Sequence, residues 1–128
     1  MSIAQDFHQW INAQSWAPGV VNFNVSYPSG EDPWYVMNVT GQEHETLTFC
    51  QSDGGLSTVE ITGYGSQRYD VFSELETLRE NIQNNLRGVI GSSSVWRCLT
   101  TGTVSTGTVE NQINEYSFEV EISWERRS

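Results

Sequence analysis

The sequence contains no lysine and few basic residues of any kind. Six arginines stand against sixteen acidic residues in a chain of 128, which gives a formal net charge of −10. No base precedes Arg68, so the first half of the chain carries only acidic charge. Affinity for nucleic acid depends on Lys and Arg side chains that neutralise phosphates. The composition therefore excludes a surface that grips DNA.

Long apolar runs are also missing. No run approaches the roughly 18 residues that a membrane span requires, and residues 1–16 have neither the basic nor the apolar region of a secretory signal. We expect a chain made in the cytoplasm that does not enter a membrane. The two cysteines, Cys50 and Cys98, are then expected to be reduced thiols. Hydrophobic residues make up 37% of the sequence, which is too many for a disordered chain, and the length suits one domain over residues 1–128.

Signatures of catalysis and of metal binding are absent from the sequence. The two histidines are His8 and His44; His8 lies off the apolar stripe of its segment, where we expect a solvated position. Alternation in an extended segment sends His44 away from Glu43 and Glu45, so these residues do not form a metal site. No nucleophile elbow or phosphate-binding loop is present. We expect no enzyme activity, no cofactor and no metal.

Two segments have helical periodicity. From Ser2 to Gln14, the apolar residues Ile3, Phe7 and Ile11 recur on one stripe. The stronger signal covers Asp70 to Arg87, with Asp70 as the expected N-cap and Gly88 as the expected C-cap. Its apolar stripe consists of Val71, Phe72, Leu75, Leu78, Ile82 and Leu86.

The remaining segments favour strands. Alternation or β-rich composition predicts strands at 21–27, 34–40, 57–64, 95–99 and 116–124. The run Ser52-Asp53-Gly54-Gly55 predicts a hairpin turn between two of them. The predicted class is α+β: a mixed, mainly antiparallel sheet packed against a long amphipathic helix, with a short N-terminal helix.

Between the last two predicted strands, Thr100 to Glu115 is rich in Thr and Gly and repeats the sequence Thr-Gly-Thr-Val at Thr101 and Thr106. Such a stretch is either the distal part of a hairpin or a mobile loop. Few apolar groups hold it to a core, so we expect it to be mobile in the free protein.

Five tryptophans and five tyrosines are many for a small chain. They could line a ligand pocket, but Trp10, Trp34 and Trp124 fall on faces that the periodicity predicts to be buried. We expect them in the core.

The order of these elements resembles that of the tail terminator proteins of long, non-contractile-tailed bacteriophages of the lambda type. The similarity extends over most of the chain and depends on pattern and not on an invariant motif. The segments that carry it are the helix Ile3–Ala13, the run Asp32–Gly41, the strand Thr58–Tyr64 before the long helix, and the final strand Tyr116–Glu125.

The resemblance implies a virion structural protein in the tail-neck region, assembled in the host bacterial cytoplasm. Such a protein forms a hexameric ring that caps the tail tube, ends tail polymerisation and offers a surface for head-tail joining. Its partners would be other copies of itself, the tail tube protein and a head-completion or connector protein. DNA would pass through an acidic lumen without specific binding. Other phage neck or tail-completion proteins, and a monomeric ligand-binding domain, are the alternatives; an enzyme comes third.

The candidate interface residues come from two segments. In the last strand and the residues after it, an acidic row lies next to bases that could pair across a head-to-tail ring interface: Glu119, Glu121, Glu125, Arg126 and Arg127. In the Thr- and Gly-rich segment, we expect contact with the tail tube through Thr103, Thr106 and Thr108.

Overall fold

The computed structural model describes residues 3–17, 19–28, 31–47, 52–109 and 113–126. A seven-stranded sheet dominates it, with strand order β1-β2-β3-β7-β5-β4 and with β6 paired to β7. All pairings are antiparallel except that of β1 with β2. The elements are α1 (Ile3–Asn12), β1 (Val21–Phe23), β2 (Trp34–Leu47), β3 (Ser52–Gly65), α2 (Arg68–Asn85), β4 (Gly88–Ile90), β5 (Ser93–Thr100), β6 (Val104–Val109) and β7 (Ile113–Arg126).

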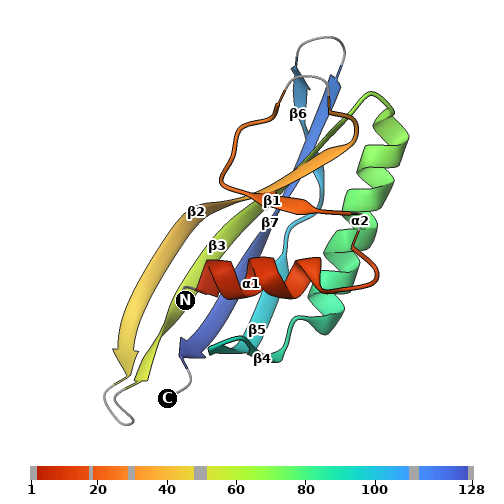
Figure 1. The fold of residues 1–128 in the computed structure, drawn as a ribbon. Coiled ribbons are helices and arrows are strands. Elements are labelled where there is room, and N and C mark those ends of the chain that lie inside the picture. The colour runs from red at the N-terminus through yellow and green to blue at the C-terminus, as the bar shows by residue number, and fades with distance from the viewer. Residues whose placement is uncertain (1–2, 18, 29–30, 48–51, 110–112, 127–128) are drawn as a thin grey trace.

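The sheet curls into a half-barrel, and both helices lie against it (Figure 1). The antiparallel register places Val59 opposite Val120, and Ile61 opposite Phe118. Since neighbouring residues of a strand point to opposite faces, this register gathers the apolar side chains of the long strands on one face. The buried residues of both helices join the same core cluster.

Helix α1 presents the stripe that its periodicity predicts, because Ile3, Phe7 and Ile11 are all fully buried. Helix α2 contributes four buried side chains, Val71, Leu75, Leu78 and Ile82. Where α2 crosses the end of β3, glycine is required: a Cβ at Gly65 would lie 2.4 Å from Cγ2 of Val71. The absence of a side chain at Gly65 therefore sets how closely α2 approaches the sheet.

The predicted fold class, a sheet packed against a long amphipathic helix, is wrong. About half of the chain is strand, and both helices are short. At 1.5 Å per residue α2 is about 27 Å long, whereas each strand of β2, β3 and β7 spans about 46 Å. No helix of the described residues can therefore cover the sheet along its length, and the β2–β3 end extends beyond both helices (Figure 1). Helix α2 also begins at Arg68, not at Asp70, and Phe72 of its predicted stripe is 40% exposed.

Much of the sheet is formed by polar segments that the sequence analysis did not predict as strands. No predicted strand covers residues 41–46, and residues 52–55 are predicted to form a turn, yet residues 41–47 pair with residues 52–58 as the distal halves of β2 and β3. Likewise, residues 104–109 of the Thr- and Gly-rich segment form β6, paired with β7. The hairpin alternative for that segment is thus the one the structure adopts. Backbone pairing in these stretches needs no apolar side chains, so periodicity does not reveal it.

Side-chain amides close two stretches of sheet edge. At the β1 edge, Asn12 Oδ1 accepts the Val21 N–H at 2.9 Å, and Asn12 Nδ2 donates to the Val21 carbonyl at 3.1 Å. At the β5 edge, Gln83 Oε1 accepts the Thr100 N–H, and Gln83 Nε2 donates to the Cys98 carbonyl, both at 2.9 Å. Each amide thus replaces the peptide group of a missing neighbour strand. These stretches of edge are blocked against pairing with another chain.

Candidate interaction surface

The face of the sheet opposite the core is the main candidate for a functional surface. We call it the open sheet face and define it by the side chains that alternate away from the core cluster on the three long strands. They are Trp34, Val36 and Asn38 of β2, Thr58, Glu60, Thr62 and Tyr64 of β3, and Glu115, Ser117, Glu119 and Glu121 of β7. Val36, Thr62 and Ser117, which lie opposite one another across the three strands, are buried, and the other side chains of this face are partly or fully exposed. Both helices bury their apolar side chains on the other face.

An acidic row crosses the middle of the open sheet face. Glu60 of β3 lies directly opposite Glu119 of β7, and Glu121 follows two residues along β7. Glu119 and Glu121 are exposed, and Glu60 is half-buried. Like charges placed directly opposite each other on a sheet are destabilising. The fold itself gains nothing from this pair, which points to a role outside the folded chain.

The acidic residues of β7 that the sequence predicted at an interface lie on a different face from Arg126. Glu119, Glu121 and Glu125 share one face of β7, whereas Arg126 alternates to the other face. Arg126 Nη1 donates to Ser92 Oγ at 2.9 Å, and the guanidinium lies 5.5 Å from the centre of the Trp124 ring. Arg126 therefore ties the end of β7 to the β4–β5 turn. Arg127 lies outside the described residues.

An aromatic cluster occupies the end of the open sheet face where β3 leads into α2. Its rings are Tyr27, Trp34 and Tyr64, and all three are half-buried. Tyr27 and Tyr64 are stacked with centroids 4.5 Å apart, and Trp34 meets Tyr27 edge-on at 5.6 Å. Burial raises the pKa of Tyr64, and its hydrogen bond with Glu115 raises it further. The sequence had suggested Trp34 as a core residue, but the core contains Trp124 and, at its margin, Trp10.

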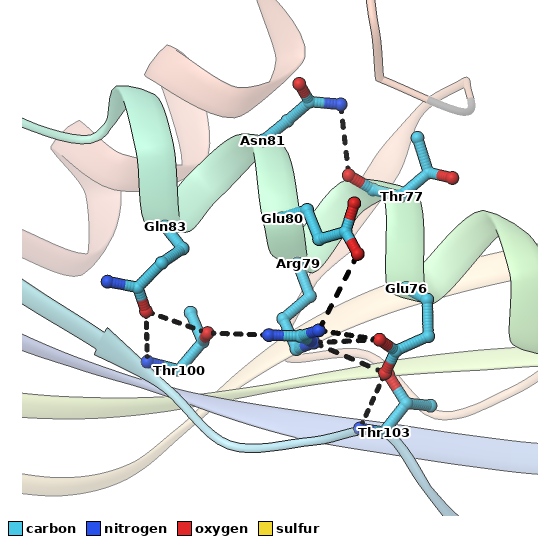
Figure 2. A network of polar contacts seen from close by, with 8 residues as sticks. All are labelled: Glu76, Thr77, Arg79, Glu80, Asn81, Gln83, Thr100 and Thr103. Carbon is cyan, nitrogen blue, oxygen red and sulfur yellow. Dashed lines mark hydrogen bonds and ion pairs between the residues drawn. The ribbon is translucent and has the colours of Figure 1, made fainter.

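A polar clamp joins α2 to the segment between β5 and β6 (Figure 2). Glu76 Oε1 accepts the Thr103 N–H at 2.9 Å, and Arg79 Nη2 donates to Glu76 Oε2 at 2.7 Å. Gln83 Oε1 accepts from both the backbone N–H and the hydroxyl of Thr100 at 2.9 Å. The hydrogen bonds from Arg79, with smaller contributions from Thr103, lower the pKa of Glu76 to about 2.

The clamp changes the interpretation of the threonines predicted to touch a tail tube. Thr103 is half-buried and its backbone is held by Glu76, so it fixes the chain before β6. Thr108 pairs with Asn114 in the β6–β7 ladder, and Thr106 lies at the irregularity between Ser105 and Gly107. All three positions are thus part of, or tied to, the sheet.

The part of the chain that the structure describes holds no metal site. Within the described ranges, no three His, Cys, Asp or Glu side chains are grouped as a metal would require. His8, expected to be solvated, instead bonds through Nε2 to the Val21 carbonyl at 2.6 Å. Cys98 is a free, buried thiol, and Cys50 lies outside the described residues. No helix among the described segments has the length and apolarity to cross a membrane.

Two cavities beside α2 are smaller than the roughly 300 to 1,000 Å³ typical of small-molecule sites. One of about 190 Å³ is lined by Trp16 and α2, and one of about 130 Å³ lies between residues 32–33 and the start of α2. Neither cavity includes the aromatic cluster. Neither of these two cavities therefore offers a site for a ligand of typical size.

Comparison with known proteins gives a similarity in structure and none in sequence. No family model matches the chain, and no curated protein matches it in sequence. Among solved structures, a chain of the "Virion of native gene transfer agent (GTA) particle" has the same fold with a TM-score of 0.61 and 10% sequence identity. The match covers 97% of this chain and 95% of that chain. At this identity the match establishes a common fold.

Proposed function

We propose that this chain is a structural protein of a phage-like virion. The observation that carries the proposal is the end-to-end match in fold with a chain of a virion particle, in which neither chain has a large additional part. A sheet face with unbalanced charge and with both helices on its other side fits a protein that acts by contact with other chains. Catalysis has no part in this function.

More specifically, the chain forms a ring that caps the tail tube, ends tail polymerisation and offers the surface for head-tail joining. Each copy carries a charge of −10, so a ring lumen lined by such copies would let DNA pass without retaining it. The same charge makes copies repel one another, so a ring must form through specific contacts. The exposed acidic row of Glu119 and Glu121 is our candidate for one side of such a contact.

Tail-tube polymerisation tests this proposal. Tube protein from the same virus would be assembled with and without the chain, and tube lengths and ends would be measured by electron microscopy. We expect shorter tubes, each with a ring at one end. Tubes of unchanged length without bound protein would contradict the capping function.

A pair of double variants tests the acidic row. Glu119→Gln with Glu121→Gln removes two charges from the open sheet face, whereas Asp70→Asn with Glu80→Gln removes two from the exposed surface of α2. We expect the first double variant to cap less efficiently, by about tenfold in the concentration required, and the second to cap normally. Equal capping by both would remove the acidic row from the contact.

A further inference from the structure

The aromatic cluster on the open sheet face is built by three separate segments. The β2–β3 register places Trp34 opposite Tyr64, and the β3–β7 register places Glu115 on the other side of Tyr64. Tyr27 comes from the segment between β1 and β2, and its ring lies over Tyr64 with an angle of 18° between the planes. The arrangement therefore depends on tertiary structure and not on one local motif.

These rings do not serve the core. The core cluster includes Tyr35, whose side chain alternates to the other face of β2, but none of Tyr27, Trp34 and Tyr64. Each of the three remains partly exposed. Burying aromatic surface is a large source of stability, so the part of each ring that stays exposed would gain stability from contact with another chain. They form a ready surface for another chain.

The strands and the segment that build the cluster carry charge of one sign. Residues 24–40, 56–65 and 113–121, which form the three strands here and the segment before β2, contain six acidic residues and no basic residue. Of these acids, Glu115 lies opposite Tyr64 and forms a hydrogen bond with its hydroxyl, and Glu60 lies on the same face four residues before Tyr64 along β3, where its charge also raises the pKa of Tyr64. A cationic group is the natural complement of this surface.

Among the cations of proteins, arginine fits best. Its planar guanidinium stacks on Tyr and Trp rings while its N–H groups point at carboxylates, which a compact ammonium cannot do as well. We propose that Tyr27, Trp34 and Tyr64, together with Glu60 and Glu115, form a binding site for an arginine side chain on another protein. Within the proposed function, we assign this arginine to a different component of the virion, because a basic partner complements a chain with a charge of −10 better than a second acidic copy does.

Binding of short peptides tests the site directly. The probe is a capped Gly-Arg-Gly-Arg-Gly peptide, followed by ¹H–¹⁵N NMR at low salt, with the indole signal of Trp34 assigned from Trp34→Phe. We expect a saturable shift of that signal with millimolar affinity. The same peptide with lysine should bind at least fivefold more weakly, and with uncharged citrulline it should not bind. An unchanged Trp34 signal, or equal binding of the lysine peptide, would overturn the proposal.

Four variants locate the site. Glu60→Gln removes only a charge, and Tyr27→Leu removes the overlying ring from a segment outside the sheet, so each should weaken arginine binding at least fivefold with the spectrum otherwise preserved. Glu80→Gln and Tyr69→Leu, which alter exposed side chains of α2, should bind within twofold of the native chain. Equal binding by all four variants would overturn the site even if the peptide binds.

The outcome is independent of the proposed function. A chain that caps tail tubes but does not shift the Trp34 signal has the virion function without this site. A chain that binds arginine as expected but neither assembles nor caps tubes has the site, and the virion function fails.

Discussion

The first prediction concerns the amide of Gln83, which hydrogen-bonds the backbone of Cys98 and Thr100 on the outer side of β5, where a neighbouring strand would otherwise bind. Gln83→Met keeps a long, unbranched, helix-favouring side chain but removes the amide. The change deletes two hydrogen bonds to the backbone at 2.9 Å and one to the Thr100 hydroxyl at 2.9 Å. At about 1 kcal/mol for each neutral hydrogen bond, less what water recovers at this half-buried position, the expected loss is about 2 kcal/mol.

The variant has a second consequence, because it exposes a free strand edge. We expect weak self-association of Gln83→Met at high concentration, since unpaired N–H and C=O groups accept another strand. Urea unfolding measures the first effect and sedimentation velocity the second. The control is Asn85→Met, which removes an amide that bonds only within α2, to the Asn81 carbonyl. If Gln83→Met were as stable and as monodisperse as Asn85→Met, the edge-closing interpretation would be refuted.

Three further predictions concern charge and packing. Because the folded-state pKa of Glu76 is lowered to about 2 from 4.5, the contribution of Glu76 to stability is complete above pH 4.5 and disappears as the pH falls toward 2. A quarter of the side chain is exposed, so solvent screening limits this contribution to about 1 kcal/mol. It is measured as the pH-dependent difference in urea stability between the native chain and Glu76→Gln. Gly65→Ala should cost about 1–3 kcal/mol because its Cβ would collide with Val71, whereas Gly102→Ala, with no atom within 4 Å of its Cβ, should be neutral in thermal unfolding. The free chain should show no duplex DNA binding at physiological salt by fluorescence anisotropy, and salt-dependent binding would contradict the repulsion expected of a charge of −10.

Periodicity located the elements whose side chains alternate between core and solvent. Ile3, Phe7 and Ile11 of α1 are buried as predicted. In β7, Phe118, Val120, Ile122 and Trp124 are buried as predicted, whereas Tyr116 is half-buried and Ser117 is buried as well. These segments are recognisable because each buries one face and exposes the other.

Hydrophobic periodicity could not predict how far the strands of the sheet extend. The distal halves of β2 and β3, and all of β6, are held by backbone pairing through polar residues, so their side chains carry no alternation of hydrophobicity. Because these strand segments were not predicted, the sheet was expected to be smaller than it is and the helix to cover more of it, which led to the wrong fold class. Polar runs that are long, lack proline and flank predicted strands were the available signal.

Part of the candidate surface could be predicted from the sequence. The alternation of Glu119 and Glu121 with apolar residues placed both on one outward face of the last strand. Their neighbour Glu60 could not be assigned to the same row without the register between β3 and β7. The aromatic cluster was hidden for the same reason, since Tyr27, Trp34 and Tyr64 meet only after three segments come together.

The most direct test of the central claim is the molar mass of the chain in solution, measured by light scattering alone and after mixing with the tail-tube protein of the same virus. The proposal of a virion ring predicts a closed oligomer, with six times the mass of the 14.5 kDa chain as the expected value, either alone at high concentration or on tube ends. A chain that stays at 14.5 kDa under both conditions, with no tube-bound fraction, would contradict it.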